Sequence, residues 1–276
     1  MTYYIRTCII LKMGIHNLNT LLRKKCPEIY KEVHLSQFAF KKVAIDISLF
    51  MFKYKTINGD NWLTGFLSLF ECLRKNELHP LFVYDSEAPP EKKEEQLKRR
   101  EVRDTIRQKN EQIKLDFEEY KKSNVKTELL NEIVSKKTDG KMLETSDEDY
   151  RSIIATEIKK LDTQTISIKK EDFDLTRELF DRLGVSYISA PIGGEAEKTC
   201  SELCINGVVD AVMSEDTDVM AYGTPIFLTK LNTFNSTAIM IQTEDIYNSL
   251  QIDYNQFRDL CIMCGNDYNT NIPKVG

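Results

Sequence analysis

Val43-Ala44-Ile45-Asp46-Ile47 is a short run of apolar, mostly β-branched residues with one carboxylate near its end. Runs of this kind are typical of strands buried in a parallel sheet. Three further stretches have the same character: 80–85, 185–188 and 210–214. Between the strands, the apolar spacing of amphipathic helices recurs at 62–75, 172–183 and 195–206. Strands that alternate with helices predict an α/β fold in which helices cover both faces of a largely parallel sheet.

The composition of the 276 residues is that of a globular protein, with 41% hydrophobic residues, 13 Phe and 12 Tyr. This length fits one or two domains. No apolar run approaches the roughly 18–20 residues of a membrane span, and the start of the chain lacks a signal peptide. We therefore expect an intracellular protein without a membrane partner. Seven cysteines, an odd number, fit reduced thiols better than a disulfide framework.

The net charge of −5, from 38 basic and 43 acidic residues, does not by itself indicate a nucleic-acid partner. Proteins that bind nucleic acids usually present a basic face. An active site built from acids would offset such a face in the total, and bound cations would reverse the local sign. The positions of the charges must therefore decide the class of partner.

Residues 91–165 interrupt the alternation of strands and helices. The first part, 91–123, holds eleven Lys or Arg and nine Asp or Glu, which predicts a long solvated helix or a pair of helices. The second part, 124–165, is rich in Ser, Thr, Asp and Lys, and we expect loops at 138–140 and 145–149. We interpret the whole interval as an insertion into the α/β domain and not as a separate domain.

Six carboxylates lie at or just beyond the ends of the predicted strands: Asp46, Asp85, Glu195, Glu197, Asp216 and Asp218. In open parallel sheets, ligands bind where the carboxyl ends of the strands meet. Carboxylates that lie so close together cannot all ionise without cations, and oxygen ligands select Mg²⁺ or Mn²⁺ over zinc. Any one of these acids alone is more typical of a helix cap or a turn. Together they predict a divalent-metal site.

Several motifs resemble those of one enzyme family. They are Met13-Gly14-Ile15-His16-Asn17-Leu18, Val43–Ser48, Phe82–Asp85 followed by Pro89-Pro90, Glu195-Ala196-Glu197, Ser214–Asp218, Ala221-Tyr222-Gly223 and Asp259–Tyr268. In order and local context they are similar to the motifs of the flap endonucleases and their XPG-type relatives, which are structure-specific 5′ nucleases. The resemblance covers residues 13–276 apart from the insertion.

The resemblance implies a fold and a ligand set. The fold is a PIN-like, three-layer α/β domain with a mostly parallel central sheet, and the charged insertion forms a helical arch. All six strand-end carboxylates correspond to metal ligands, and the resemblance adds Asp267 as a seventh. Two Mg²⁺ ions are implied, with Mn²⁺ able to substitute. One ion is held mainly by Asp46, Asp85, Glu195 and Glu197, and the other by Asp216, Asp218 and Asp267.

The resemblance also implies roles for Lys93, Arg100 and Phe52. Lys93 and Arg100 are two helical turns apart and share a face of the predicted helix, like the arch residues that steer and neutralise the scissile phosphate. Phe52 resembles an aromatic side chain on which a terminal base stacks. Without the family context, the two basic residues are ordinary for a charged surface helix, and the phenylalanine is ordinary for a helix core.

The cysteines and histidines do not indicate a further site. Cys261 and Cys264 form a CxxC motif, but no second pair lies at the spacing of a zinc ribbon. Cys200 and Cys204 are helical neighbours at i and i+4. We interpret all four as buried structural thiols. The three histidines are scattered along the chain and suggest neither zinc nor acid–base chemistry.

Both ends of the chain depart from the family pattern. Family members usually begin at the Met-Gly motif, so we expect residues 1–12 to be an N-terminal extension and Met13 to be the natural start. Residues 272–276 resemble the opening of the family's helix–two-turns–helix element, which grips duplex DNA, and we expect this element to be truncated. No basic tail for a sliding-clamp partner is visible. The interval between Asp85 and Glu195 is longer than in compact flap endonucleases.

The sequence thus predicts a structure-specific DNA endonuclease that cuts near 5′ flaps or single-strand/duplex junctions by two-metal catalysis, in DNA replication, repair or recombination. We expect a monomer in the nucleus (the host nucleus, if the chain comes from a large DNA virus) or in the cytoplasm. Alternatives are a 5′→3′ exonuclease or bubble-cutting repair nuclease of the same superfamily, a non-catalytic nucleic-acid-binding module, and a PIN-like ribonuclease. The seven acids disfavour the binding module. The Met-Gly start and the Asp267 segment disfavour the ribonuclease.

Overall fold

A computed structural model describes residues 14–86, 92–138, 145–269 and 272. The chain divides into two compact units. The first, here called the sheet unit, comprises Lys12–Glu95 and Ile168–Gly276. The second, the helical unit, contains Gln96–Ser167. The boundaries of the helical unit in the sequence are close to those of the expected insertion at 91–165, and the proposed division of the chain into domains stays a prediction.

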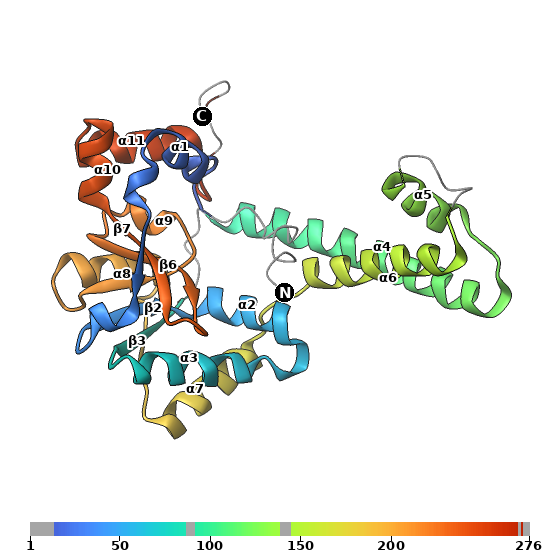
Figure 1. The fold of residues 1–276 in the computed structure, drawn as a ribbon, viewed down its shortest axis with the longest axis horizontal. Coiled ribbons are helices and arrows are strands. Elements are labelled where there is room, and N and C mark those ends of the chain that lie inside the picture. Colours follow the sequence, from blue (N-terminus) through green and yellow to red (C-terminus); the bar gives the residue numbers. More distant parts are fainter. Residues whose placement is uncertain (1–13, 87–91, 139–144, 270–271, 273–276) are drawn as a thin grey trace. The chain divides into compact units, whose positions relative to one another are not determined.

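The sheet unit contains a seven-stranded sheet in the order β1-β7-β6-β5-β2-β3-β4. Its strands are β1 (Lys31–His34), β2 (Lys42–Asp46), β3 (His79–Tyr84), β4 (Ser186–Ser189), β5 (Ala211–Met213), β6 (Ile226–Asn232) and β7 (Thr237–Gln242). Strands β2, β3, β6 and β7 are labelled in Figure 1. From β6 to β4 all neighbours are parallel, whereas β7 and β1 pair antiparallel at one edge. The prediction of a mostly parallel sheet is confirmed. The structure adds β1, β6 and β7 to the four predicted strands.

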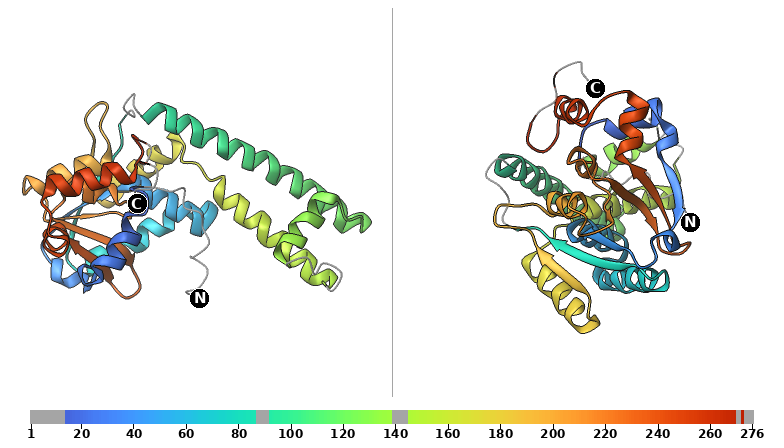
Figure 2. Two further views of the ribbon diagram at one scale, coloured as in Figure 1. Left: turned by 90° about the horizontal axis from the view of Figure 1, so that it is seen from above. Right: turned by 90° about the vertical axis from the view of Figure 1, so that its left-hand side faces the viewer.

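Helices cover both faces of this sheet (Figures 1 and 2). One face carries α2 (Ile47–Asn58), α3 (Leu63–Lys75) and α7 (Lys170–Leu183). The other carries α1 (Leu18–Lys25), α8 (Ala196–Ile205), α9 (Asp218–Ala221), α10 (Thr243–Leu250) and α11 (Tyr254–Cys264). Short 3₁₀ turns lie at Pro27–Ile29, Leu35–Phe38 and Gly59–Asn61. The three-layer α/β class is therefore confirmed.

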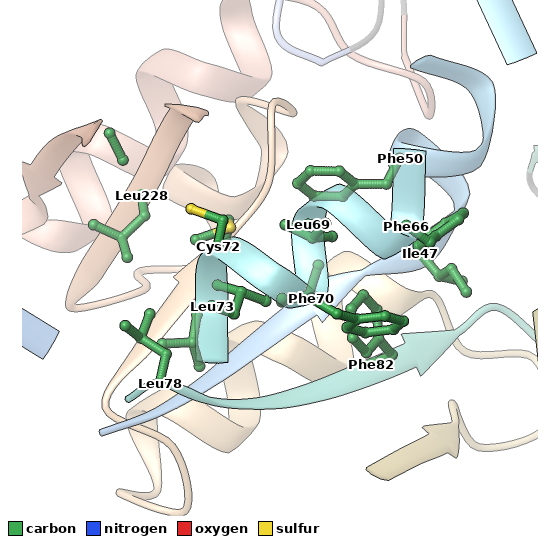
Figure 3. Close-up of a cluster of buried hydrophobic side chains, with 14 of the residues drawn as sticks. Ile47, Phe50, Phe66, Leu69, Phe70, Cys72, Leu73, Leu78, Phe82 and Leu228 are labelled. Carbon is green, nitrogen blue, oxygen red and sulfur yellow. The ribbon is translucent and has the colours of Figure 1, made fainter. Parts of the chain in front are cut away.

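The sheet unit has two hydrophobic cores, one on each face of the sheet, and the side chains of β2 point alternately into one and the other. In β2, Val43 and Ile45 face α2, α3 and α7, while Ala44 faces the opposite layer. Successive side chains of a strand point to opposite faces. A run in which every residue is apolar, with no polar residue in between, therefore fits a strand that is buried on both faces. Figure 3 shows part of the first core, in which Phe66 and Phe82 pack edge to face with ring centroids 6.3 Å apart.

The helical unit has a core of its own. It contains α4 (Lys93–Ser123), α5 (Glu128–Lys137) and α6 (Asp147–Gln164). Its buried cluster consists of Ile113, Phe117, Tyr120, Leu130, Ile133, Val134, Tyr150, Ile154 and Leu161. The expected solvated helix therefore describes the first half of α4, where Leu97 and Val102 are exposed. It is wrong for the second half, which packs against α5 and α6.

The loop expected at 145–149 is also wrong in part, because α6 begins at Asp147. The Ser146 hydroxyl accepts a hydrogen bond from the Asp149 backbone N–H at 3.1 Å and so caps the helix. Acids in the first turn are favoured there by the helix dipole. In the loop expected at 138–140, Thr138 follows α5, and the other two residues lie outside the described part of the chain.

The expectations for the two ends of the chain fall on residues that are not described. The extension at 1–12, the start at Met13 and all of the 272–276 segment except Ile272 belong to this group. Among the described residues, no helix is long and apolar enough to cross a membrane. The described cysteines, Cys26, Cys72, Cys200, Cys204, Cys261 and Cys264, are free and buried, which confirms the interpretation of structural thiols.

We predict that Phe180→Ala destabilises the protein by about 3–5 kcal/mol, because the ring fills the core between α7 and the sheet. Its centroid lies 4.6 Å from that of Phe82 and 5.2 Å from that of Phe70. The measurement is the free energy of unfolding in denaturant. Phe234→Ala is the matched control, since that ring is 94% exposed, and its effect should stay within about 0.5 kcal/mol. Equal effects of the two substitutions would contradict this description of the core.

Candidate active site

The carboxyl ends of neighbouring strands bring the predicted acids together. Strands β5, β2 and β3 are adjacent and parallel, with Ile45 of β2 opposite Met213 of β5 and Phe82 of β3. Asp46 is the last residue of β2, and Asp85 follows the end of β3. Asp216 lies in the turn after β5. The strands thus deliver three acids to one edge of the sheet, as the sequence predicts.

Backbone N–H groups at the starts of helices hold these acids. Asp46 caps α2, and its Oδ1 accepts the Ser48 N–H at 2.9 Å. Asp216 Oδ1 accepts the N–H of Asp218, the first residue of α9, at 2.9 Å. Asp85 Oδ1 accepts the N–H of Ala196, the first residue of α8, also at 2.9 Å. The helix-cap interpretation is therefore correct for one oxygen of each carboxylate, and the helix dipoles stabilise their negative charge.

Two other carboxylate oxygens have no such partner. Asp46 Oδ2 and Asp218 Oδ1 are buried and receive no hydrogen bond from the described residues. A buried, unsatisfied polar atom costs free energy, and for a charged group the cost is larger. A bound cation would remove this cost. These two orphaned oxygens are the structural observation that fits a metal ion at this edge.

The first group of acids lies around Asp46 and Glu197. Burial, followed by the charges of Asp85 and Asp216, raises the pKa of Asp46 well above its ordinary value. Burial and the charges of Asp46, Asp85 and Asp216 do the same to the pKa of Glu197. Even the pKa of the Cys200 thiol beneath them is raised, first by burial and then by Asp46 and Glu197. Four carboxylates therefore repel one another at close range.

The second group lies around Asp218. Burial and the charges of Asp216 and Asp267 raise the pKa of Asp218 to about 8, against the opposing charge of Lys92. Glu195 raises the same pKa. The structure thus groups Glu195 with Asp218 and Asp267, whereas the resemblance groups it with Asp46 and Asp85. All seven acids are connected by these interactions, although no three acid, His or Cys side chains in the described ranges are arranged to hold a metal ion.

Lys92 and two tyrosines surround Glu195. The Lys92 ammonium forms an ion pair with Glu195 Oε1 and lies 3.5 Å from Asp267 Oδ2. Burial opposes the charge of Lys92, but the hydrogen bond and the charge of Glu195 raise its pKa above the ordinary value. The hydroxyl of Tyr222 donates to Glu195 Oε2 at 3.3 Å, and the hydroxyl of Tyr268 donates to the same oxygen. Sequence reasoning misses all three residues, although Tyr222 and Tyr268 belong to motifs that carry the resemblance.

The remaining predicted residues have different positions. Phe52 is half-buried on α2 and belongs to none of the hydrophobic clusters of the described residues, which favours a role outside the core. Lys93 is the first residue of α4, and its side chain lies outside the description. Arg100 is an exposed residue of the same helix, within the helical unit. The roles of these three residues stay proposals.

Gly14 explains why the Met-Gly motif needs a glycine. Its φ is +80°, and an added Cβ would lie closer than 3.0 Å to Thr217 Oγ1 and Asp216 Oδ1. The next residue, Ile15, donates its backbone N–H to Thr217 Oγ1 at 2.9 Å. The His16 N–H donates to the Gly265 carbonyl, also at 2.9 Å. The N-terminal segment therefore packs directly against Asp216, and any side chain at position 14 would displace that carboxylate.

The turn 191–194 is fixed to the segment after β3 that carries Asp85. The Ser86 hydroxyl donates to the Pro191 carbonyl at 2.6 Å and accepts the Gly194 N–H at 3.0 Å. Gly194 also closes the turn by donating to the Pro191 carbonyl at 2.7 Å. Because Glu195 follows immediately, these bonds position its carboxylate relative to Asp85.

Comparison with protein families matches two segments. Residues 13–106 match the XPG N-terminal domain, and residues 184–267 match the XPG I-region. Among curated relatives, "Probable RAD2-like endonuclease 076L" of Invertebrate iridescent virus 3 is 34% identical over 294 residues, which cover 96% of this chain and 76% of the relative. Flap endonuclease 1 of Zea mays is 28% identical over 281 residues, which cover 96% of this chain and 64% of that protein.

Solved structures share the fold. The catalytic core of Rad2 in complex with DNA substrate matches with a TM-score of 0.61 and 20% identity, over 95% of this chain and 64% of that one. Human GEN1 in complex with Holliday junction DNA matches with a TM-score of 0.58 and 17% identity, over 95% of this chain and 53% of that one. This chain therefore spans less than two thirds of either solved structure.

We predict that Asp218→Asn stabilises the metal-free protein more and more as the pH rises from about 4 to about 8. The folded wild type keeps the Asp218 proton up to about pH 8, whereas the unfolded chain loses it near 3.8. Stability of the wild type therefore falls across this window, and asparagine removes that dependence. The measurement is the free energy of unfolding of both proteins in EDTA at several pH values.

Glu215→Gln is the control with the opposite sign. Burial opposes ionisation of Glu215, but the charges of Lys53 and Lys230 lower its pKa. Its stabilising contribution should therefore be present at neutral pH and disappear as the pH falls. A gap between wild type and Asp218→Asn that does not change with pH would contradict the raised pKa of Asp218.

Proposed function

This chain belongs to the XPG-type family of RAD2-like endonucleases, and on that premise we propose that it is a structure-specific endonuclease that hydrolyses phosphodiester bonds of DNA. Its sites of cleavage are 5′ flaps and junctions between single-stranded and duplex DNA. The observation that carries this proposal is a pair of buried carboxylate oxygens, Asp46 Oδ2 and Asp218 Oδ1, that lack a hydrogen-bond donor among the described residues. They belong to a group of seven acids that are connected by their charges. Such a group is favourable only when cations neutralise it.

The donor set suits two Mg²⁺ ions, with Mn²⁺ as a substitute, because all candidate ligands are oxygens. When bound, a pair of divalent cations supplies an activated water and relieves charge on the leaving oxygen. The electrostatic neighbours of Asp46 and Glu197 support one ligand group: Asp46, Asp85, Glu197 and Asp216. Those of Asp218 support a second: Asp218, Asp267 and Glu195.

The protein's own residues orient these ligands. Helix starts fix one oxygen each of Asp46, Asp85 and Asp216. Among the described residues, Asp46 Oδ2 and Asp218 Oδ1 have no hydrogen-bond donor and can face a cation. Lys92 balances part of the negative charge of Glu195 and Asp267. The tyrosine hydroxyls at Glu195 hold its carboxylate in one orientation. Orientation by such outer contacts is a usual requirement of metal sites in enzymes.

Substrate contacts are proposed for Lys93, Arg100 and Phe52. The two basic side chains steer and neutralise the scissile phosphate, and the aromatic ring stacks on the terminal base. The protein acts as a monomer in DNA replication, repair or recombination, in the nucleus or the cytoplasm. A panel of labelled flap, bubble, nicked-duplex and single-stranded RNA substrates, each with Mg²⁺ or EDTA, separates this activity from a 5′→3′ exonuclease, a bubble-cutting nuclease, a ribonuclease and a non-catalytic binding protein.

We predict that Asp85→Asn abolishes cleavage of flap DNA while preserving the fold. An asparagine keeps an oxygen for the Ala196 N–H, and its amide can still hydrogen-bond to the Ser48 hydroxyl, which now donates to Asp85 Oδ2 at 2.6 Å. The negative charge that compensates a cation is lost. The expected decrease in kcat is about 100-fold or more, because removal of one such electrostatic contact has costs of this order.

The matched control is Asp210→Asn at the opposite edge of the same sheet. Asp210 Oδ2 accepts the Lys42 N–H at 2.8 Å at the start of β2, so its replacement makes a similar local change away from the carboxylates. Cleavage should persist in this variant. Near wild-type cleavage by Asp85→Asn, with its melting temperature unchanged, would refute the metal-ligand assignment.

We predict that Lys93→Ala combined with Arg100→Ala lowers kcat about 100-fold and changes the affinity for flap DNA much less, because both charges act on the reacting phosphate. Single-turnover cleavage and equilibrium binding measure the two effects separately. If the double substitution at Lys93 and Arg100 lowers only the affinity for DNA and leaves kcat unchanged, these residues are ordinary contacts to the DNA backbone.

Lys92→Ala, at the neighbouring residue, is the comparison variant. Because it removes an ammonium that competes with cations for Glu195, it should lower the Mg²⁺ concentration needed for half-maximal rate.

A further inference from the structure

Two lysines converge on one glutamate immediately beside the candidate active site. Lys53 Nζ of α2 lies 2.8 Å from Glu215 Oε1, and Lys230 Nζ of β6 lies 2.9 Å from Glu215 Oε2. Glu215 directly precedes Asp216 in the turn after β5. We call these three residues the basic bridge. It connects three elements of the sheet unit at the edge that carries the acids.

The backbone at Lys230 is held in an unfavourable conformation. Its φ is +53°, a left-handed value that non-glycine residues rarely adopt inside a strand. The pairing of β6 with β7 is irregular at this point, since the register shifts between Thr229 and Asn232. Bulges of this kind redirect side chains and are concentrated near functional sites. Here the bulge accompanies a lysine side chain that reaches Glu215.

The charges of the basic bridge are unequal. Two ammonium groups share one carboxylate, which leaves one net positive charge beside a cluster of seven acids. Each ammonium has three N–H donors, and Glu215 accepts one from each. The lysine side chains are 33% and 57% exposed, whereas the Glu215 side chain is 22% exposed. The positive groups are therefore the more accessible part, and they can donate to a second acceptor.

Stability alone does not require this arrangement. The ion pair of Glu215 with the exposed Lys230 contributes only about 0–1 kcal/mol, and the left-handed backbone at Lys230 opposes folding by a similar or larger amount. A single lysine would satisfy Glu215. The second lysine and the strained backbone are explained if the basic bridge receives an anion.

We propose that the basic bridge binds a phosphate group of the DNA strand next to the phosphate that is cleaved, and so positions the strand over the carboxylates. The inference rests on the proposed function, because DNA is the polyanion that this site would meet. Lys53 and Lys230 are positioning residues. Glu215 holds one ammonium group at each of its two oxygens, so that both groups can donate to the same phosphate. Such contacts fix register on the nucleic acid without reading its sequence.

The test compares two double variants of equal charge. Lys53→Gln with Lys230→Gln removes the basic bridge. Lys31→Gln with Lys41→Gln removes two lysines that pair with Asp245 and Asp210 elsewhere on the sheet unit. Binding of a labelled flap duplex is measured by anisotropy in EDTA, from about 50 to about 200 mM salt. We expect the first variant to bind about 10-fold more weakly at low salt, with a salt slope smaller by roughly one. The control variant should retain wild-type affinity and slope.

Two further variants separate binding from a structural role. Lys53→Arg with Lys230→Arg keeps both charges and should keep the affinity. Lys230→Gly removes one charge but relieves the left-handed φ, so its melting temperature should equal or exceed that of the wild type while its affinity falls. A lower melting temperature of Lys230→Gly with unchanged affinity would show that the bridge is only structural. If the wild type cleaves flap DNA but the Lys→Gln pair binds like its control, this inference fails and the proposed function stands. A wild type that neither binds nor cleaves DNA would overturn both.

Discussion

Repulsion between carboxylates is the constraint on which this structure depends. Like charges a few ångströms apart destabilise the folded chain, and burial increases the effect because the surrounding medium screens charge poorly. The fold counters this repulsion with the N–H groups at the starts of α2, α8 and α9, which bond Asp46, Asp85 and Asp216. It also places Lys92 between Glu195 and Asp267. The compensation is incomplete, since the pKa values of Asp46, Glu197 and Asp218 remain raised.

The order of the strands explains why the acids meet. The chain builds β2 and β3 side by side, adds β4 beyond β3, and then returns to place β5 on the other side of β2. The change of direction leaves the carboxyl ends of β2 and β5 adjacent, which is where ligands bind in sheets of this type. The Gly14 segment closes the same region, because only a glycine fits against Asp216 and Thr217. Motifs that are far apart in the sequence, the Gly14 segment and those at the carboxyl ends of β2 and β5, thus together build the site around Asp216.

The sequence predicts well what depends on local periodicity. The apolar runs around Ala44 and Phe82 identify strands buried on both faces, and the acids that follow them mark the carboxyl edge. Features that depend on tertiary contacts are harder to predict from the sequence. Asp267 lies in a turn after α11 and not at a strand end, so only its motif indicates it. Lys92 and Lys93 are adjacent in a charged run, and the contact of Lys92 with Glu195 depends on the folded chain. In the sequence of α4, apolar residues such as Phe117 and Tyr120 are too sparse to predict a hydrophobic core. The core forms because residues of α5 and α6 pack against them.

The strand order also sets a sequence of events during synthesis on the ribosome. The helical unit is a continuous stretch with local contacts, which form quickly. By contrast, β2 has a partner on only one side until β5 is made, and its open edge is a site for wrong pairing in the growing chain. All five remaining acids are made after Asp46 and Asp85: Glu195, Glu197, Asp216, Asp218 and Asp267. The acidic centre is therefore complete only after Asp267 has been made, and shorter nascent chains do not contain all of its carboxylates.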